Sequence, residues 1–387
     1  MDFELTEEQL LVKEMAASFA EKEVKPLASR MDREAAYPAE LVHRLGEMGF
    51  LGMLVPEEFG GAGMDVISYV LAMEEISKVW ASLGVIVSVN NSLVCAPLLK
   101  FGSEAQKKKY LAPLARGERL GCYALTEPGA GSDAGAIQTH AVKSDGSYVI
   151  NGSKVFITHG KYADLAIVFA VTDPSLGKHG ISAFVVEKNT PGFTVGRLED
   201  KLGLRSSDTA ELLFHDCRVP SDNLLGHEND GFKIALSSLD GGRIGIAAQA
   251  LGIAQGCLEE SVAHAKQRHQ FGHAIGEFQA IQWMLADMAT EIDAARLLTY
   301  RAAWLLENHR SVTKEAAMAK LFASEAANRI AYRGIQIFGG YGFTKEFAVE
   351  RFFRDARITT LYEGTAEIQR WVIARRLIHG DEAHEIR

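Results

Sequence analysis

The hydrophobic pattern of this chain changes its period twice, near Gly121 and again from Gly231. Between those points, short β-type runs follow one another with turn residues between them and no helical segment. Strands that are consecutive in this way usually pair antiparallel, so this block predicts an antiparallel sheet that forms its own small barrel or sandwich. The blocks on either side have helical periodicity. We therefore predict an α+β protein with a helical domain at 1–120, a β domain at 121–230 and a four-helix-bundle-like domain at 231–387.

Local signals place individual elements within these blocks. The dipeptide Asn151-Gly152 lies between the β-type runs 147–150 and 153–158 and predicts a tight hairpin. In the last block, Ala-rich and apolar periodicity predicts helices at 244–258, 278–306 and 313–338. The faces of these helices fit either core packing or subunit contacts.

Composition argues against several classes of function. The chain has 387 residues and a net charge of −9, so no nucleic-acid or polybasic membrane role is expected. Its four cysteines are far apart and form no CxxC pair, which argues against a disulfide framework or a thiolate metal site and fits a reducing compartment. No apolar run approaches the length of a membrane span. The acidic, amphipathic start resembles neither a signal peptide nor a transit peptide, so we expect a bacterial cytoplasmic protein, or a matured protein of the mitochondrial matrix.

A carboxylate stands beside a glycine in the tetrad Tyr362-Glu363-Gly364-Thr365. Helical periodicity runs up to this tetrad and resumes after it. Glycine at such a break lets the backbone approach a ligand closely, and a carboxylate there can project into a cavity and act as a base. A surface glutamate at a helix end is the alternative interpretation.

Two stretches of the β block offer ligand contacts. Residues 125–135, LTEPGAGSDAG, contain backbone N–H groups, the hydroxyls of Thr126 and Ser132, and enough glycine for close approach. Their spacing is not the GxGxxG of a dinucleotide fold, so a polar turn is an equally good interpretation. At 155–158, VFIT, Phe156 could stack on a ring that Thr158 hydrogen-bonds, although an ordinary strand edge also explains this pattern.

Three glycine-containing stretches interrupt the last helical block. Residues 268–273, RHQFGH, place two histidines four apart, but a Phe-Gly pair separates them and no HExxH motif is present, so no metal site is expected. Arg268 and Gln270 in this stretch suit an anionic ligand. The DGGR of 240–243 fits either a capped helix start or a phosphate contact, and the glycines of 336–340 are typical of a helix end.

Together and in this order, these stretches resemble the flavin-dependent acyl-CoA dehydrogenases. The resemblance covers almost the whole chain. It rests on LTEPGAGSDAG (125–135), VFIT (155–158), KLGLRSSDTAEL (201–212), RHQFG (268–272), IQIFGGYGF (335–343) and RDARITTLYEGTAEIQR (354–370). It is closest to the short-chain, butyryl-CoA type, notably in SLDGGRIGIAAQALGIAQ (238–255) and KEAAMAKLFASEAA (314–327).

The resemblance implies roles for individual residues. Glu363 looks like the base that removes the α-proton of the acyl thioester, with Tyr362 and Gly364 lining the acyl pocket. Flavin contacts are implied for Tyr123, Leu125, Thr126, Ser132, Phe156, Thr158, Thr365 and Glu367. Contacts with the flavin of a neighbouring subunit are implied for Arg268, Gln270, Phe271, Gln279, Gln336, Ile337, Gly339 and Gly340. Contacts with coenzyme A are implied for Ser132, Asp240 and Arg243.

The chemistry implied by the resemblance is α,β-desaturation of an acyl-CoA. Loss of a proton from Cα is coupled to hydride loss from Cβ to N5 of FAD, and the product is a trans-2-enoyl-CoA. In the family, the backbone N–H of the base and a ribityl hydroxyl of FAD hold the thioester oxygen and stabilise the developing enolate. The resemblance also implies a homotetramer, a dimer of dimers, that passes electrons to electron-transferring flavoprotein in fatty acid β-oxidation.

The sequence departs from the family pattern at several positions. His159 stands where many relatives have Asn, and Phe156 where Trp is common. Gly242 occupies the position at which isovaleryl-type relatives carry their base, so the carboxylate at Glu363 favours a straight-chain substrate. Asn90 and Asn91 are polar for a helix that lines the acyl pocket in relatives, and they suggest either a structural position at solvent or a helix end, or a polar pocket for an unusual acyl group.

We therefore predict an FAD-dependent dehydrogenase of a short or small acyl-CoA. One alternative is a dehydrogenase of a cyclic or branched acyl-CoA, and another is an acyl-CoA oxidase. An alternative of a different class is a flavin-free, non-catalytic scaffold of the same fold, against which the presence of Glu363 argues.

Overall fold

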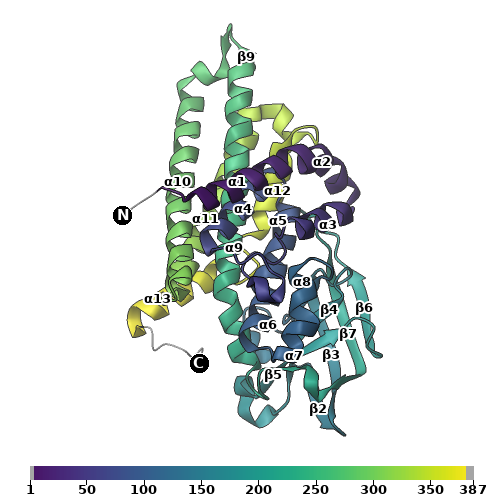
Figure 1. Cartoon of the computed structure of the whole chain (residues 1–387). Coiled ribbons are helices and arrows are strands. Elements are labelled where there is room, and N and C mark those ends of the chain that lie inside the picture. The colour runs from purple at the N-terminus through teal and green to yellow at the C-terminus, as the bar shows by residue number, and fades with distance from the viewer. Residues whose placement is uncertain (1–3, 381–387) are drawn as a thin grey trace.

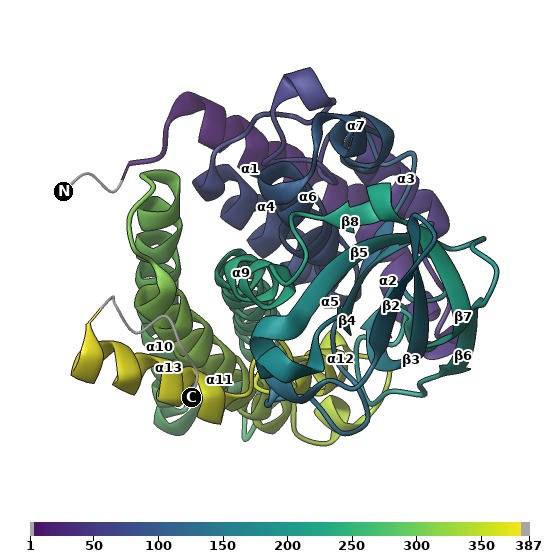
Figure 2. The same cartoon turned by 90° about the horizontal axis from the view of Figure 1, so that it is seen from below.

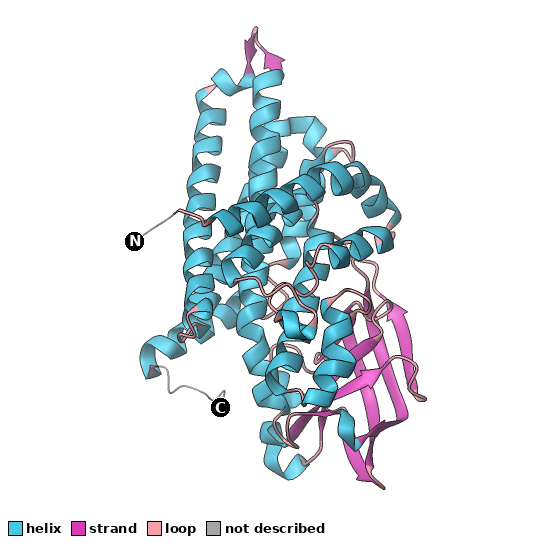
Figure 3. Ribbon diagram, viewed as in Figure 1, coloured by secondary structure: helices cyan, strands magenta, loops and turns pink. Residues whose placement is uncertain are grey.

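The computed structural model of the chain describes residues 4–380, so the outermost residues of the first and third predicted domains, 1–3 and 381–387, lie outside the described part. The large sheet lies on one side of the molecule, and a short two-stranded hairpin projects from the opposite end of the helices (Figure 3). The predicted order of helices, then a sheet, then helices is confirmed.

The N-terminal part consists of helices that share one apolar core with the C-terminal helices and with part of the sheet. Its helices are α1 (Glu7–Phe19), α2 (Lys25–Glu34), α3 (Ala39–Glu47), α4 (Val66–Val79), α5 (Ala81–Ser88), α6 (Ala96–Phe101), α7 (Glu104–Gln106) and α8 (Ala112–Ala115). A π-helical turn, Val89–Cys95, joins α5 to α6 without a break.

The prediction that no apolar run approaches the length of a membrane span was wrong. The continuous helical segment Ala81–Phe101 has 21 residues and a mean hydropathy of 1.6, which is enough by length and composition. Its most apolar window is 89% buried inside the protein, however, and this is the position of a core helix.

The sheet of the middle part has the strand order β6-β7-β3-β2-β4-β5-β8, with β1 paired to β4. Its strands are β1 (Gly121–Ala124), β2 (His140–Ser144), β3 (Ser147–Thr158), β4 (Leu165–Val171), β5 (Ile181–Glu187), β6 (Phe193–Leu198), β7 (Thr209–Pro220) and β8 (Leu224–Leu225). Most neighbours run antiparallel, as predicted, but β4 runs parallel to β1 and meets β2 in parallel as well. The sheet is therefore mixed, because the β2–β3 excursion separates β1 from β4 and lets them align in the same direction.

The predicted hairpin at Asn151-Gly152 was wrong. β3 runs straight through this dipeptide. Its pairing with β7 shifts register there, and the extra residue of this β-bulge lies in β7. Gly152 is required because a Cβ at this position would lie 2.4 Å from Oγ1 of Thr139. The tight turn is at Asp145-Gly146 instead, where both residues have positive φ angles, 45° and 70°.

The C-terminal part is a bundle of long helices in which α9 packs against α4, α10 and α11. Its elements are α9 (Gly231–Gln267), β9 (His269–Gln270), β10 (His273–Ala274), α10 (Gln279–Glu307), α11 (Thr313–Phe338), α12 (Ala348–Ile358) and α13 (Ala366–His379). Figure 2 shows α9 between α10 and α11 on one side and the sheet on the other. Because α9 begins at Gly231, the DGGR of 240–243 lies inside a helix and not at a helix start, as one sequence interpretation had it.

A buried ionic cluster joins the three parts of the chain. Arg354 of α12 binds the carboxylate of Asp32 in α2 at 2.7 Å, and its neighbour Asp355 accepts a 2.7 Å hydrogen bond from the backbone N–H of Leu204. Burial raises the pKa of Asp355 to about 7, and the nearby charge of Asp32 raises it further. The helix that leads to the Glu363 tetrad is thus anchored to both other parts. The predicted domain boundaries near 120 and 230 fall in the connections before β1 and before α9, and stay a prediction.

Candidate active site

A cavity of about 1930 Å³ lies where the sheet, α9 and α13 meet. It gathers twelve of the residues that the sequence analysis singled out: Tyr123, Leu125, Thr126, Ser132, Phe156, Thr158, Asp240, Arg243, Tyr362, Glu363, Gly364 and Glu367. Among the stretches interpreted as ligand contacts, those around 268 and 336 contribute none of these residues. The cavity is large enough for two ligands of nucleotide size.

Glu363 occupies the predicted break between two helices. α12 ends at Ile358, α13 begins at Ala366, and both Glu363 and Gly364 have left-handed backbones, with φ angles of 50° and 88°. A left-handed glutamate is unusual and requires support from its surroundings. The side chain of Gln369 provides support, since its Nε2 donates to the carbonyl oxygens of Glu363 and Gly364 at 3.1 and 2.9 Å.

Thr365 does not line the cavity. Its hydroxyl accepts a hydrogen bond from the backbone N–H of Ile368 at 3.3 Å and so caps the start of α13. Its observed contact is therefore structural, and it fixes the point at which the helix resumes after Glu363.

The carboxyl group of Glu363 has a raised pKa and an unpartnered oxygen atom, which are properties that suit a general base. Burial raises the pKa of Glu363 to about 7, while the positive charges of Lys320 and Arg243 oppose this rise. Within residues 4–380, the Oε2 atom of Glu363 has no hydrogen-bond partner, although it is buried. A carboxylate that is desolvated and unpartnered in a cavity can accept a proton from a ligand.

Gly242 makes the space for this carboxylate. A Cβ on Gly242 would lie 2.0 Å from Oε2 of Glu363 and 3.3 Å from Cδ2 of Leu93. Positions 242 and 363, the two alternative places for the base in the family, therefore face each other. Only one of them can carry a side chain in this arrangement.

The loop after β1 is held by a buried ion pair that the sequence analysis missed. Lys154 of β3 is fully buried, and its Nζ donates to Oε1 of Glu127 at 2.8 Å and to the carbonyl of Leu125 at 3.1 Å. Glu127 also accepts the backbone N–H groups of Gln138 and Thr139. A lysine inside a β-type run was the available signal, because such a lysine needs a partner when it is buried.

The end of β3 presents an aromatic ring to the cavity. Phe156 has a left-handed backbone, with a φ of 57°, at the second register shift, where the extra residue lies in β3. Phe156 is 66% exposed although its side chain is large and apolar. Thr158 lines the cavity two residues further along. His159, by contrast, is buried, and its Nδ1 hydrogen-bonds the carbonyl of Gly121 at 3.1 Å, so this departure from the family pattern ties β3 to β1.

The interpretation of Asn90 and Asn91 as residues at solvent or a helix end was wrong. Both are buried in the π-helical turn. Asn90 donates to the carbonyls of Leu51 and Leu114 at 2.8 and 3.2 Å. Asn91 binds the carbonyl of Phe50 and the N–H of Met53, both at 2.8 Å. Neither asparagine lines the cavity, so they do not make it polar.

The remaining predicted site residues lie away from the cavity: Arg268, Gln270, Phe271, Gln279, Gln336, Ile337, Gly339 and Gly340. The turn with β9 and β10 projects at the end of the molecule remote from the sheet (Figure 1). The side chain of Phe271 is 91% exposed there, and the guanidinium of Arg268 lies 5.3 Å from the ring centre of Tyr341. Within one chain, these residues do not join the Glu363 site.

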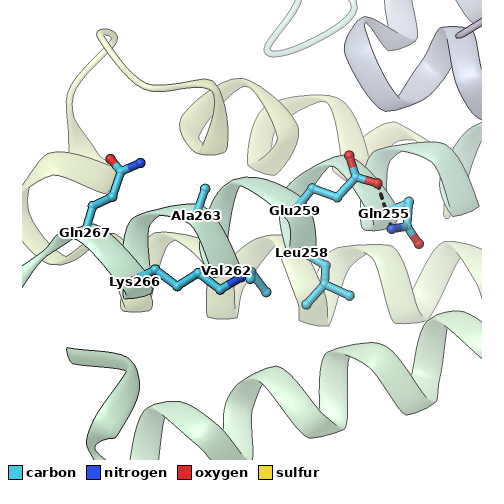
Figure 4. A pocket seen from close by; sticks show the side chains of 7 residues that line it. All are labelled: Gln255, Leu258, Glu259, Val262, Ala263, Lys266 and Gln267. Carbon is cyan, nitrogen blue, oxygen red and sulfur yellow. Dashed lines mark hydrogen bonds between the residues drawn. The ribbon is translucent and has the colours of Figure 1, made fainter. Parts of the chain in front are cut away.

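A second, smaller hollow of about 450 Å³ lies along one face of α9 (Figure 4). All seven of its lining residues belong to this one helix: Gln255, Leu258, Glu259, Val262, Ala263, Lys266 and Gln267. Among residues 4–380 there is also no group of three or more His, Cys, Asp or Glu that could hold a metal ion. The cavity at Glu363 is therefore the candidate active site.

The fold places a buried carboxylate, that of Glu363, in a cavity that can hold a large ligand. Three family models match in chain order: "Acyl-CoA dehydrogenase, N-terminal domain" at 6–118, "middle domain" at 122–217 and "C-terminal domain" at 229–378. The chain belongs to the acyl-CoA dehydrogenase family.

Individual relatives are similar over nearly their full length. A short-chain specific acyl-CoA dehydrogenase of Clostridium acetobutylicum is 51% identical, and the match covers 97% of this chain and 100% of that protein. The structure of butyryl-CoA dehydrogenase from Megasphaera elsdenii is 48% identical with a TM-score of 0.97, covering 98% of this chain and 100% of that one. A chain from a structure of the electron transferring flavoprotein of Acidaminococcus fermentans is 53% identical with the same TM-score and coverage.

Proposed function

We propose that this protein dehydrogenates a short or small acyl-CoA to the trans-2-enoyl-CoA, with Glu363 as the base that removes the α-proton and FAD as the cofactor. The observation that carries this proposal is the buried, unpartnered carboxylate of Glu363 in a cavity of about 1930 Å³. The similarity to proteins named for short-chain and butyryl-CoA substrates supports the choice of substrate.

The residues around the cavity fit a flavin. Phe156 offers an exposed ring, Thr126 and Thr158 offer hydroxyls, and Cβ atoms at Gly129 and Gly131 would meet no atom within 4 Å, so the loop leaves open space. We assign Tyr123, Leu125, Thr126, Ser132, Phe156, Thr158 and Glu367 to this site. FAD, when bound, accepts the hydride that leaves the β-carbon of the substrate.

The chain itself supplies the proton acceptor and an enolate-stabilising donor. Among the hydrogen bonds within residues 4–380, none is donated by the backbone N–H of Glu363. A free N–H beside the base suits the thioester oxygen, on which negative charge develops as the proton leaves. Gly364 has no side chain to obstruct this approach.

The cavity lining also matches the two ends of an acyl-CoA. It includes the apolar side chains of Val85, Val89 and Leu93, which suit a small hydrocarbon chain. It also includes several cations, which suit the phosphates of coenzyme A: Lys100, Lys178, Lys233, Arg243, Arg310 and Arg375. Ser132, Asp240 and Arg243 remain our proposed coenzyme A contacts.

This function is tested with purified protein mixed anaerobically with acyl-CoA thioesters of different length, branching and ring content. We expect a yellow protein whose flavin absorbance is bleached fastest by butyryl-CoA or another small straight-chain thioester. Rapid oxygen consumption with the same thioesters would identify an oxidase instead, and a colourless protein that binds no FAD would contradict the proposal.

The raised pKa of Glu363 predicts how activity depends on pH. Since only the carboxylate form accepts a proton and the pKa is about 7, we expect kcat/KM to rise about tenfold per pH unit below that value and to level off above it. The measurement is the rate of flavin reduction at limiting butyryl-CoA across the pH range in which the protein stays folded. A rate that is independent of pH on the acid side would contradict the assignment of a carboxylate with a raised pKa as the base.

We further propose a homotetramer, a dimer of dimers, that passes electrons to an electron-transferring flavoprotein. A solved structure of the electron transferring flavoprotein of Acidaminococcus fermentans contains a chain with this fold at 53% identity. Large apolar side chains on α10 support subunit contacts, since Trp283, Leu297 and Trp304 are about half exposed or more. The similarity to bacterial and mitochondrial relatives supports a bacterial cytoplasmic or a mitochondrial matrix location.

In this assembly, the exposed residues of the β9–β10 turn and of the 336–340 segment complete the flavin site of a neighbouring subunit. We expect Arg268→Ala to weaken FAD retention and tetramer formation together, because Arg268 holds the turn against Tyr341 and offers a cation to the flavin. Light scattering after gel filtration and the ratio of flavin to protein absorbance measure both effects. A flavin-replete tetramer of the variant would contradict a shared site.

A further inference from the structure

A buried lysine lies beneath the tetrad that carries the base. Lys320 of α11 has no exposed surface, and its Nζ donates a 2.7 Å hydrogen bond to the carbonyl oxygen of Gly364. The same carbonyl accepts Nε2 of Gln369 at 2.9 Å. Lys320 is absent from the cavity lining, so it lies behind the base rather than at the ligand.

The charged groups around Lys320 come from three elements. Glu363 of the break and Glu367 of α13 act on it as negative charges, and Arg243 of α9 acts as a positive charge. Its one hydrogen bond within residues 4–380 goes to a neutral carbonyl, so no carboxylate is bonded directly to the ammonium group. Burial lowers the pKa of Lys320 to about 8, so the group is still largely charged at neutral pH.

Arg243, the other cation near Glu363, is hydrogen-bonded to a carboxylate, whereas Lys320 is not. Arg243 donates to Oδ1 of Asp240 at 2.8 Å, and Oδ2 of Asp240 is held by Thr313 at 2.7 Å. The carboxylate of Asp240 therefore offsets much of the field of Arg243 at Glu363. Lys320 has no such counter-ion, and a buried cation without one stabilises the nearest available anion strongly.

We propose that Lys320 is a positioning residue for the base: it holds the carbonyl of Gly364, and so the backbone that carries Glu363, and its charge favours the carboxylate form of Glu363. This inference rests on the proposed function for its catalytic consequence, but not for the interaction itself. Lys320 keeps the base available for proton transfer at neutral pH although the carboxylate of Glu363 is buried.

Two variants separate the charge of Lys320 from its hydrogen bond. Lys320→Gln keeps a donor for the Gly364 carbonyl but has no charge, whereas Lys320→Met has neither. Lys314→Met is the matched control, because Lys314 lies on the same helix, is partly exposed and pairs with Glu315 instead. If Lys320→Met does not fold, Lys320→Gln alone decides the role of the charge.

The readout is the protonation of Glu363 itself in the FAD-loaded protein, followed by infrared difference spectroscopy as a function of pH. The carboxyl band of Glu363 is identified as the one missing from Glu363→Gln. We expect its midpoint to rise by at least about one pH unit, a tenfold gain in proton affinity, in both Lys320 variants and to stay unchanged in Lys314→Met. The acid limb of kcat/KM should move by the same amount.

An unchanged midpoint in a folded Lys320→Gln protein would overturn the proposal, since a purely structural lysine would not affect the protonation of Glu363. The infrared result does not depend on turnover. If no acyl-CoA bleaches the flavin of the unaltered protein, the proposed function fails while the midpoints still decide the role of Lys320.

Discussion

Glu363→Gln should bind FAD as the unaltered protein does and yet lose the bleaching of its flavin by butyryl-CoA, by a factor of about 10³ or more. Glutamine has nearly the same shape as glutamate, so the break between α12 and α13 and its hydrogen bonds from Gln369 are retained. What is lost is the carboxylate that we propose as the acceptor of the α-proton. The measurement is stopped-flow absorbance of the flavin under anaerobic conditions, together with the flavin-to-protein ratio.

Glu346→Gln is the matched control for this experiment, because Glu346 is an exposed glutamate that precedes α12 and does not line the cavity. Its bleaching rate should equal that of the unaltered protein. Normal bleaching in Glu363→Gln would show that another group is the base.

Gly242→Ala should reduce the bleaching rate by about 10² without unfolding the protein. The added Cβ would lie 2.0 Å from Oε2 of Glu363, so the carboxylate must move away by about 1 Å or more. A displacement of that size is enough to lose proximity to the α-carbon. Since alanine favours the helix more than glycine does, α9 should stay intact. The rate of flavin bleaching tests the expected loss, and circular dichroism tests whether the helices are retained.

Gly241→Ala provides a control on the adjacent residue of the same helix. A Cβ at Gly241 would have its nearest neighbour, Cβ of Ser92, at 3.9 Å, which is an ordinary contact. We expect full activity in this variant. Equal losses in both variants would attribute the effect to the helix, and no loss in Gly242→Ala would contradict the tight packing of Glu363 against this position.

The large-scale organisation could be predicted from the sequence because it depends on the hydrophobic period of neighbouring residues. The changes of hydrophobic period near Gly121 and Gly231 correspond to the starts of β1 and α9, and the predicted end points Thr313 and Phe338 are those of α11. The break at Glu363 was visible for the same reason, since a glycine interrupts a helical pattern there.

Interactions between distant segments were not visible in this way. The Asn-Gly pair at 151–152 has the composition of a turn, but its glycine is needed because β3 passes close to Thr139. Asp145-Gly146 is also a dipeptide that favours a tight turn, and it makes the turn. Local chemistry could not rank the two, because the deciding contact comes from another strand.

The buried polar residues show the same limit. Lys154 and Lys320 have no local partner, and their functions depend on carbonyls 29 and 44 residues away in sequence. Asn90 and Asn91 bond to backbone groups between 4 and 41 residues away. A buried polar side chain can be recognised from sequence as unusual, but the acceptor that satisfies it is a property of the fold.

The left-handed backbone of Glu363 has a consequence for how such a protein can evolve. A glycine would adopt this conformation at no steric cost. An uncharged side chain would also remove the destabilisation that comes from burying a carboxylate. Because the pKa rises from 4.5 to about 7, the folded protein loses stability as pH increases through that interval, by up to about 3 kcal/mol. Selection for stability alone would therefore replace Glu363, and its presence is what the proposed role as the base requires.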